Sequence, residues 1–209
     1  MDAQLPSLTQ LAVSSPVDAW ERCGFSAPAG MIVAGTTAIV PGCRELSWAF
    51  SGSAVSPTGL DGIPTYQAAA PTAPTANPNG VIGMDHVVVL SGRPAHTRAV
   101  FEQFGLEARG AKIRADKGPD RSECFFWAGD VLIELVGPVD DLSEQDQPAR
   151  IWGVTFVVED FEALQSASDV AIGAPRPAVQ EGRMISTLSK EAGLGLAVAF
   201  MSPHPKREK

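Results

Sequence analysis

The eight residues GMDHVVVL, numbered 83 to 90, set the interpretation of the rest of the chain. Side chains alternate between the two faces of a β-strand, and this apolar run has the length and β-branched content of one. His86 interrupts the run and shares a face with Val88 and Leu90. Three roles are open for it at this point: a metal ligand, a wall of a ligand pocket, or a buried structural histidine.

A helix and three strands are predicted after this stretch. The helix covers 93–105, because Pro94 suits a first turn and Gly105 suits a helix end. The strands fall within 106–116, 122–129 and 130–138. The apolar stripe of the helix comprises Val100, Phe101 and Phe104.

The same order then recurs. A strand over 151–158 and a helix over 159–168 precede three further predicted strands, within 176–180, 183–190 and 194–203. A fainter copy begins at 8–13 and ends near Phe50. Internal repetition of this kind indicates structural modules. We predict the following organisation: an abbreviated β-α-β-β module at 1–52, a Pro/Ala/Thr-rich extended linker at 53–80, β-α-β-β-β modules at 81–145 and 146–204, and a charged tail at 205–209.

Composition excludes several classes of function. The net charge of −8 disfavours both nucleic acid and anionic membranes as partners, since each is bound through an excess of Lys and Arg. Three cysteines without a C-x-x-C motif predict neither a zinc knuckle nor a thioredoxin-like site. Neither a signal peptide nor a stretch of about 18 apolar residues is recognisable. A cytoplasmic protein is therefore expected.

The segment GMDHVVVL, a following helix and then VLIELVGP resemble the glyoxalase/bleomycin-resistance/dioxygenase superfamily, also called the vicinal oxygen chelate superfamily. The segments LDGIPT, PARIWGVTFVVEDFEAL and GLAVAFMSP resemble glyoxalase-like proteins of actinobacterial type. The resemblance implies an α+β fold in which repeated β-α-β-β-β modules form a curved mixed sheet around a pocket. The helices are expected on the outer face of that sheet.

In metal-dependent members of the superfamily, each module offers one ligand early in its first strand and a carboxylate in its last strand. His86 and Glu134 match these positions in the module at 81–145, and Gly153 and Ala199 match them in the module at 146–204. Because neither Gly153 nor Ala199 has a side-chain donor, we predict no metal ligands and no cofactor. A divalent ion (Zn, Ni, Mn or Fe) completed by a ligand from elsewhere is the alternative.

Without a metal, two roles remain for His86 and Glu134. They are a structural pair across neighbouring strands, or a catalytic pair in which Glu134 orients His86 as a general base. Arg183 follows a tight turn and is a candidate for binding an anionic ligand, although an exposed place at a strand edge is the favoured interpretation. The ligand pocket is assigned to Gly153, Thr155, Arg183, Ala199 and Trp127.

The aromatic residues of CFFWAG alternate, so Phe126 faces away from Phe125 and Trp127. One of these faces is expected in the core, and the other is available to an apolar ligand. Core packing is the default interpretation for Trp48, Trp127 and Trp152.

The favoured hypothesis is a small-molecule-binding protein without a metal, which sequesters its ligand as resistance-type relatives do. An enzyme is the first alternative: a lyase, isomerase or dioxygenase that uses a metal, or a metal-free acid–base catalyst. A protein-interaction module is the second. An odd number of modules leaves a sheet edge unpaired, which motivates the hypothesis of a homodimer.

Overall fold

The computed structural model describes residues 5–52, 59–72, 76–115, 119–140 and 148–205. Most of the predicted charged tail lies outside these residues. The chain divides into two compact units: unit 1 comprises 1–11, 46–70 and 86–153, and unit 2 comprises 12–45, 71–85 and 154–209. No helix in the described stretches has the length and apolarity needed to cross a membrane.

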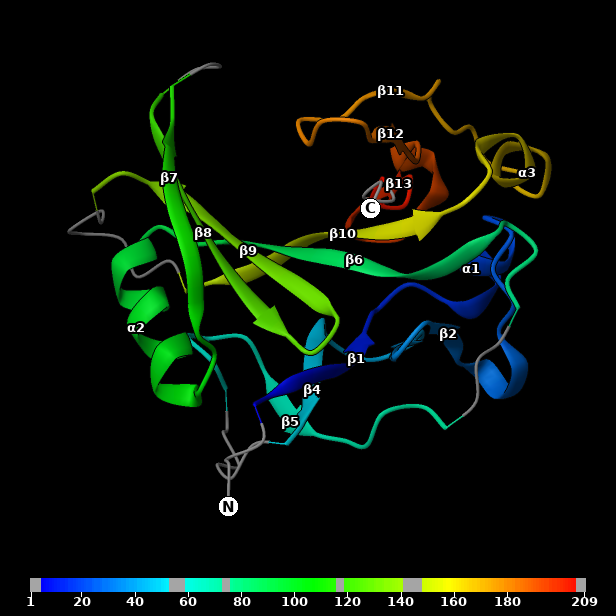
Figure 1. Cartoon of the computed structure of the whole chain (residues 1–209). Coiled ribbons are helices and arrows are strands. Elements are labelled where there is room, and N and C mark those ends of the chain that lie inside the picture. The colour runs from blue at the N-terminus through cyan, green and yellow to red at the C-terminus, as the bar shows by residue number, and fades with distance from the viewer. Residues whose placement is uncertain (1–4, 53–58, 73–75, 116–118, 141–147, 206–209) are drawn as a thin grey trace. The chain divides into compact units, whose positions relative to one another are not determined.

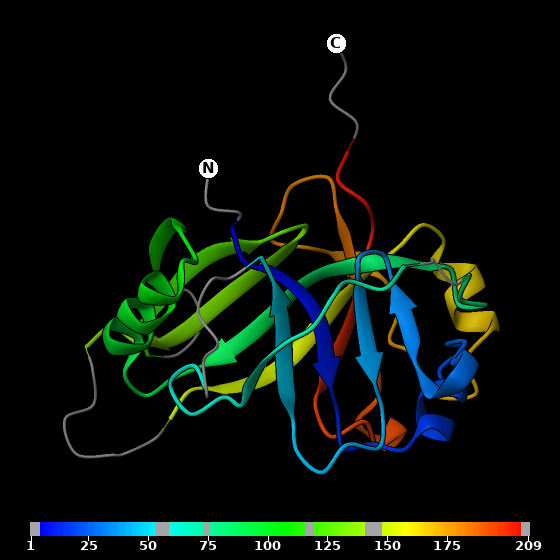
Figure 2. The same ribbon diagram turned by 90° about the horizontal axis from the view of Figure 1, so that it is seen from below.

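Unit 1 contains a mixed sheet and one long helix (Figure 1). Its strand order is β10-β6-β9-β8-β7, with β6 parallel to β9 and with β8 antiparallel to both β9 and β7. A second group of strands has the order β1-β4-β5 (Figure 2). The elements that lie wholly or partly in unit 1 are β1 (Ser7–Ala12), β4 (Ser47–Ser51), β5 (Thr65–Gln67), β6 (Val81–Leu90), α2 (Pro94–Phe104), β7 (Ala108–Arg114), β8 (Arg121–Ala128), β9 (Val131–Pro138) and β10 (Arg150–Val158).

Aromatic side chains of α2 form the core of unit 1. Phe101 lies 5.8 Å from Trp48 of β4 and 5.4 Å from Phe126 of β8, measured between ring centroids. The helix begins at Pro94 and is capped by Gly105 at φ 102°, in the left-handed region that glycine adopts without strain. Both predicted ends of this helix are confirmed.

Unit 2 has its own aromatic core. Its strand order is β11-β12-β13-β10-β6. Trp20, Phe25, Phe156 and Phe200 contact one another with ring centroids 5.1 to 6.3 Å apart. Besides its parts of β6 and β10, its elements are α1 (Val17–Glu21), the 3-10 helix Pro28–Gly30, β2 (Ile32–Ala34), β3 (Thr37–Val40), α3 (Phe161–Ser166), β11 (Arg176–Pro177), β12 (Met184–Thr187), the 3-10 helix Lys190–Ala192 and β13 (Ala197–Met201).

The predicted repeat is present in the order of the strands. The series β6-α2-β7-β8-β9 and β10-α3-β11-β12-β13 each place their last strand beside their first. The predicted α+β class with repeated β-α-β-β-β modules is thus confirmed. The compact units divide within β6 and β10, so the proposed module boundaries remain a sequence-based prediction.

The stretch predicted as an extended linker contains regular structure in its described residues. Thr65 begins β5 opposite Trp48 of β4, and the Trp48 indole Nε1 donates a 2.8 Å hydrogen bond to the Thr65 hydroxyl. In unit 2, the Asn77 amide donates to the carbonyl of Val33, and the Asn79 amide donates to that of Cys23. Single polar side chains thus anchor a proline-rich segment that has no apolar periodicity, and the domain bounds assigned to it stay a prediction.

Candidate functional site

Helix α2 packs against one face of the sheet in unit 1, and the other face carries polar and partly exposed side chains. Val87, Val89, Ile133 and Leu135 point to the helix side and are at most 1% exposed. We call the opposite side of β6, β9 and β8 the open face. Its members are His86, Val88 and Leu90 of β6, Leu132, Glu134 and Val136 of β9, and Glu123, Phe125 and Trp127 of β8.

His86 and Glu134 meet on the open face. His86 lies opposite Leu132, and Glu134 lies opposite Val88, so the two side chains are diagonal neighbours on parallel strands. The His86 Nε2 atom is 3.9 Å from the Glu134 Oε2 atom, and the side chains are 12% and 23% exposed. This is the distance of an ion pair and exceeds that of a direct hydrogen bond. Strand alternation predicted the face of each residue, and the resemblance to the superfamily predicted that their two strands are neighbours.

The environment of Glu134 favours its protonated form. Burial raises the pKa of Glu134, and the charge of His86 opposes this only partly. A half-buried carboxyl beside an imidazole can hold or release a proton according to what binds next to it. This behaviour is a common property of acid–base pairs in ligand sites.

Aromatic side chains flank the pair. Phe125 lies opposite Glu134 and Trp127 lies opposite Leu132, while Phe126 points to the α2 side and is fully buried. Trp127 is 46% exposed, so the default prediction of core packing is wrong for it. The same prediction is wrong for Trp152 of β10, also 46% exposed, and is correct for Trp48, at 1%.

A cluster of charges on β7 and β8 was not predicted. The Glu123 carboxylate accepts ion pairs from Lys112 and Arg114 at 3.2 Å and from Arg121 at 3.3 Å, although only 5% of its side chain is exposed. Burial alone would raise the pKa of Glu123, but hydrogen bonds and charges from Arg114 and Lys112 outweigh it and lower the pKa. The alternating charges of KIR at 112–114 and RSE at 121–123 were the available signal.

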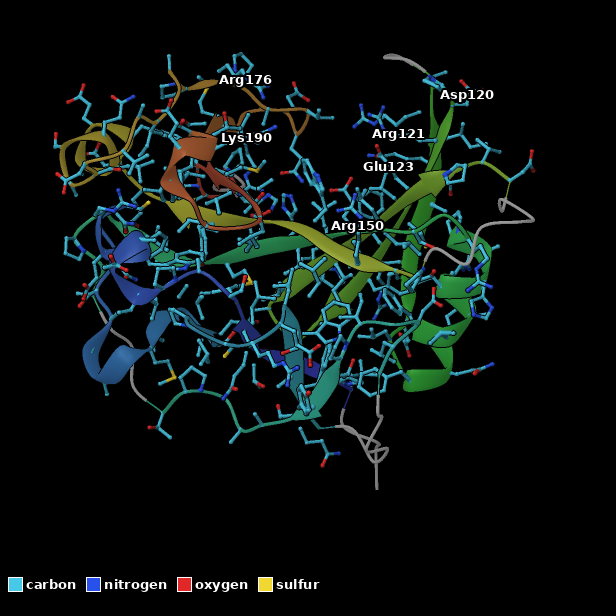
Figure 3. All side chains as sticks on the ribbon, turned by 180° about the vertical axis from the view of Figure 1, so that it is seen from behind. Asp120, Arg121, Glu123, Arg150, Arg176 and Lys190 are labelled. Carbon is cyan, nitrogen blue, oxygen red and sulfur yellow. The ribbon has the colours of Figure 1, made fainter. Side chains whose placement is uncertain are left out.

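A groove of about 660 Å³ begins where the open face ends. Leu90 and Val136 continue the open face into it, and Arg121 and Arg150 line it as well. Figure 3 shows Arg121 and Glu123 extending from β8 and Arg150 from β10. The groove therefore joins the apolar part of the open face to cationic side chains.

The other predicted pocket residues lie in different surroundings. Gly153, in unit 1, is buried. In unit 2, Thr155 is 4% exposed, and Ala199 is half-buried opposite Thr187. The Arg183 side chain has 0% exposure, so its predicted place at an exposed strand edge is wrong. Its guanidinium donates to the carboxylate of Asp85, the Gln180 side chain and the Ser202 carbonyl, all within unit 2.

The described side chains on the open face offer too few ligands for a complete metal site. His86 and Glu134 offer two ligands, whereas catalytic zinc sites normally use three from the protein. The described residues contain no group of three or more His, Cys, Asp or Glu side chains suited to one ion. The residues described therefore do not fit a complete site, and no chemical step is assigned to a metal.

The chain matches no protein-family model and no curated protein. Solved structures do resemble it. A 4-hydroxymandelate synthase variant from Streptomyces coelicolor is 14% identical with a TM-score of 0.63, over 97% of this chain and 94% of that one. The chain has the vicinal oxygen chelate fold.

Two further solved structures resemble the chain. A fusion of a xylose isomerase-like TIM barrel with 4-hydroxyphenylpyruvate dioxygenase is 9% identical, with a TM-score of 0.63 over 99% of this chain and 50% of that one. Methylmalonyl-CoA epimerase from Mycobacterium tuberculosis is 18% identical, with a TM-score of 0.48 over 63% of this chain and 95% of that one. At these identities the likeness concerns the fold, and one fold hosts many chemistries.

Proposed function

We propose that this protein binds an organic small molecule on the open face of unit 1 and in the adjoining groove. The observation that carries the proposal is the His86–Glu134 pair at 3.9 Å, half-buried beside the partly exposed Trp127. The groove volume of about 660 Å³ lies within the range of ligand pockets, which is roughly 300 to 1,000 Å³. Apolar walls with a few convergent polar groups are typical of such sites.

The arrangement of the pair supports binding more than simple packing. Keeping Glu134 partly out of water opposes its ionisation, and an apolar residue at this strand position would avoid that cost. An exposed tryptophan beside it offers a large, rigid surface for an organic ligand. The two features lie on the side of the sheet that α2 leaves uncovered.

The test is a thermal-shift screen of small organic fragments against the whole protein. A ligand that binds the folded state raises the melting temperature by mass action. Hits at the proposed site lose their shift in Trp127→Ala and His86→Ala. They keep it in Tyr66→Ala, the matched control, because Tyr66 is 55% exposed on β5 and lies outside the open face. Hits that survive both open-face substitutions, or a screen without hits, would contradict the proposal.

A second candidate function is metal-free acid–base catalysis by the same pair. His86 would accept a proton from the bound molecule, and Glu134 would balance the charge of the resulting imidazolium. The place of Glu134 beside His86, on a face with partly exposed side chains, supports this candidate. The measurement is deuterium incorporation from D₂O into each confirmed hit, followed by proton NMR. Exchange in the native protein that is lost in His86→Gln supports catalysis, and equal exchange in both proteins contradicts it.

A further inference from the structure

We infer that the groove of unit 1 is an anion subsite, which takes the carboxylate or phosphate group of a ligand with an apolar body. This inference rests on the proposed function, because it names the class of molecule that would bind there. Three observations support it. Cationic side chains lie at the groove, apolar residues form its wall, and the groove lies on the same strands as His86 and Glu134.

The charges around the groove leave a cationic excess. Among the described residues, Arg121 and Arg150 line the groove with one carboxylate, Asp120, and Lys112 and Arg114 join Arg121 around Glu123. The lowered pKa of Glu123 keeps it ionised, yet one carboxylate cannot balance three cations. The excess stands out in a protein whose net charge is −8. A local field of this sign attracts anions.

Arg150 is the cation best placed to contact a ligand. Its neighbour Ile151 is buried, while Arg150 itself is exposed and lines the groove. Within the described part of the chain, no ion pair or hydrogen bond engages its side chain. A guanidinium presents a planar fork of donors that matches carboxylate and phosphate oxygens. Arg121 lines the same groove while its Nε atom is engaged with Glu123 at 3.3 Å.

The apolar residues of the groove define the body of the ligand. Leu90 and Val136 lie on the open face, and Pro119, Pro138 and Pro148 complete the apolar wall. Such a surface favours a hydrocarbon or aromatic body over a sugar-like one, because it offers few hydrogen bonds to hydroxyl groups.

Strand geometry gives the length of that body. Val136 is two positions beyond Glu134, and Leu90 is four positions beyond His86. At about 3.3 Å per residue, the anionic group would lie roughly 7 to 13 Å from the atoms that face the pair. A compact organic acid or phosphate monoester of about six carbons reaches the lower end of this interval.

The experiment compares three probes by protein-observed NMR with the whole chain: hexanoate, monohexyl phosphate and the neutral hexanamide. Each is titrated into the native protein and into Arg150→Gln. The matched control is Arg176→Gln, since Arg176 is an exposed arginine of unit 2 (labelled in Figure 3) outside the groove. Arg121→Gln is a second groove variant, and melting temperatures establish that every variant is folded.

We expect at least one anionic probe to bind about tenfold more tightly than hexanamide, as one charge-assisted hydrogen bond would produce. Arg150→Gln should remove most of that preference, and Arg176→Gln should keep it. The stronger of the two anions identifies the head group as carboxylate or phosphate. The bound probe should change the NMR chemical shifts of Leu90 and Val136.

Equal affinities for hexanoate, monohexyl phosphate and hexanamide would overturn the anion subsite. The inference would also be overturned if Arg150→Gln and Arg176→Gln lost the preference for anionic probes to the same extent. If hexanamide alone binds and perturbs the signals of His86 and Trp127, the proposed function stands while the anion inference fails. If no probe perturbs any residue of the open face or the groove, both are contradicted.

Discussion

Arg183 and Asp85 lie 98 positions apart in the sequence and form an ion pair inside unit 2. The arginine side chain has 0% exposure and that of the aspartate has 9%. A pair removed from water in this way is costly to break, because the remaining charge is left without its partner.

We therefore predict that Asp85→Ala destabilises the protein by about 3 to 5 kcal/mol. The measurement is urea unfolding at neutral pH. The double variant Asp85→Leu/Arg183→Met should recover most of the loss, since it removes both charges together. A single-variant loss below about 1 kcal/mol, the range of surface pairs, would show that the pair is hydrated in solution.

The protonation of Glu134 gives a pH-dependent prediction. Its pKa is raised in the folded protein, so between the ordinary carboxyl value of 4.5 and the raised value the folded state binds more protons than the unfolded state. The contribution of Glu134 to stability is therefore present below 4.5 and is lost as the pH rises through the raised value. Glu134→Gln should be more stable than the native protein at pH 7 and should lose this advantage at pH 4.

The direct check is the carboxyl carbon of Glu134 followed by NMR. Its titration midpoint should lie above the ordinary carboxyl value of 4.5. A midpoint at or below 4.5 would remove the basis of this prediction.

Glu123 should behave in the opposite way. Its pKa is lowered, so its contribution to stability is present above the ordinary carboxyl value and is lost as the pH falls through the lowered one. We expect Glu123→Gln to cost about 2 kcal/mol at pH 7, below the full cost of breaking a buried pair, because Lys112 and Arg121 are partly exposed. The difference in unfolding free energy between Glu123→Gln and the native protein should vanish in strong acid. A constant difference across the pH range would mean that packing, and not charge, is responsible.

Gly62 supports one wall of the groove. It has φ 89°, and a Cβ atom added there would lie 2.3 Å from the Cβ atom of Pro148, a groove residue. Gly62→Ala should cost about 2 to 4 kcal/mol, because left-handed strain and overpacking act together. Gly30→Ala is the control, since Gly30 has φ 76° and open space around the added atom, so strain alone should cost about 1 to 2 kcal/mol. If calorimetry gave the same loss of stability for Gly62→Ala and Gly30→Ala, Pro148 would be shown to move aside freely.

Local patterns of the sequence predicted the faces of the strands but not their surroundings. The alternation along β6 and β9 placed His86 and Glu134 correctly, since side-chain direction in a strand depends only on position. The same reasoning paired Trp127 with Phe125. It could not tell that this side of the sheet is the uncovered one, because that depends on where α2 packs.

Contacts between distant segments were beyond sequence reasoning. Nothing local to RMISTLSK indicates that Arg183 meets Asp85, and an arginine after a turn is usually exposed. The groove was missed for the same reason: Leu90, Arg121 and Arg150 come from three strands that only the folded sheet brings together.

The four tryptophans of the chain divide into two pairs by exposure. Trp20 and Trp48 are at most 1% exposed, one in the aromatic core of each unit, whereas Trp127 and Trp152 are each 46% exposed. The intrinsic emission of the protein should therefore have a blue component that acrylamide cannot reach and a red component that it quenches. Unfolding would shift the first component, and an occupant of the open face would shield Trp127 in the second. The native chain thus carries separate optical reporters of folding and of occupancy, without an added label.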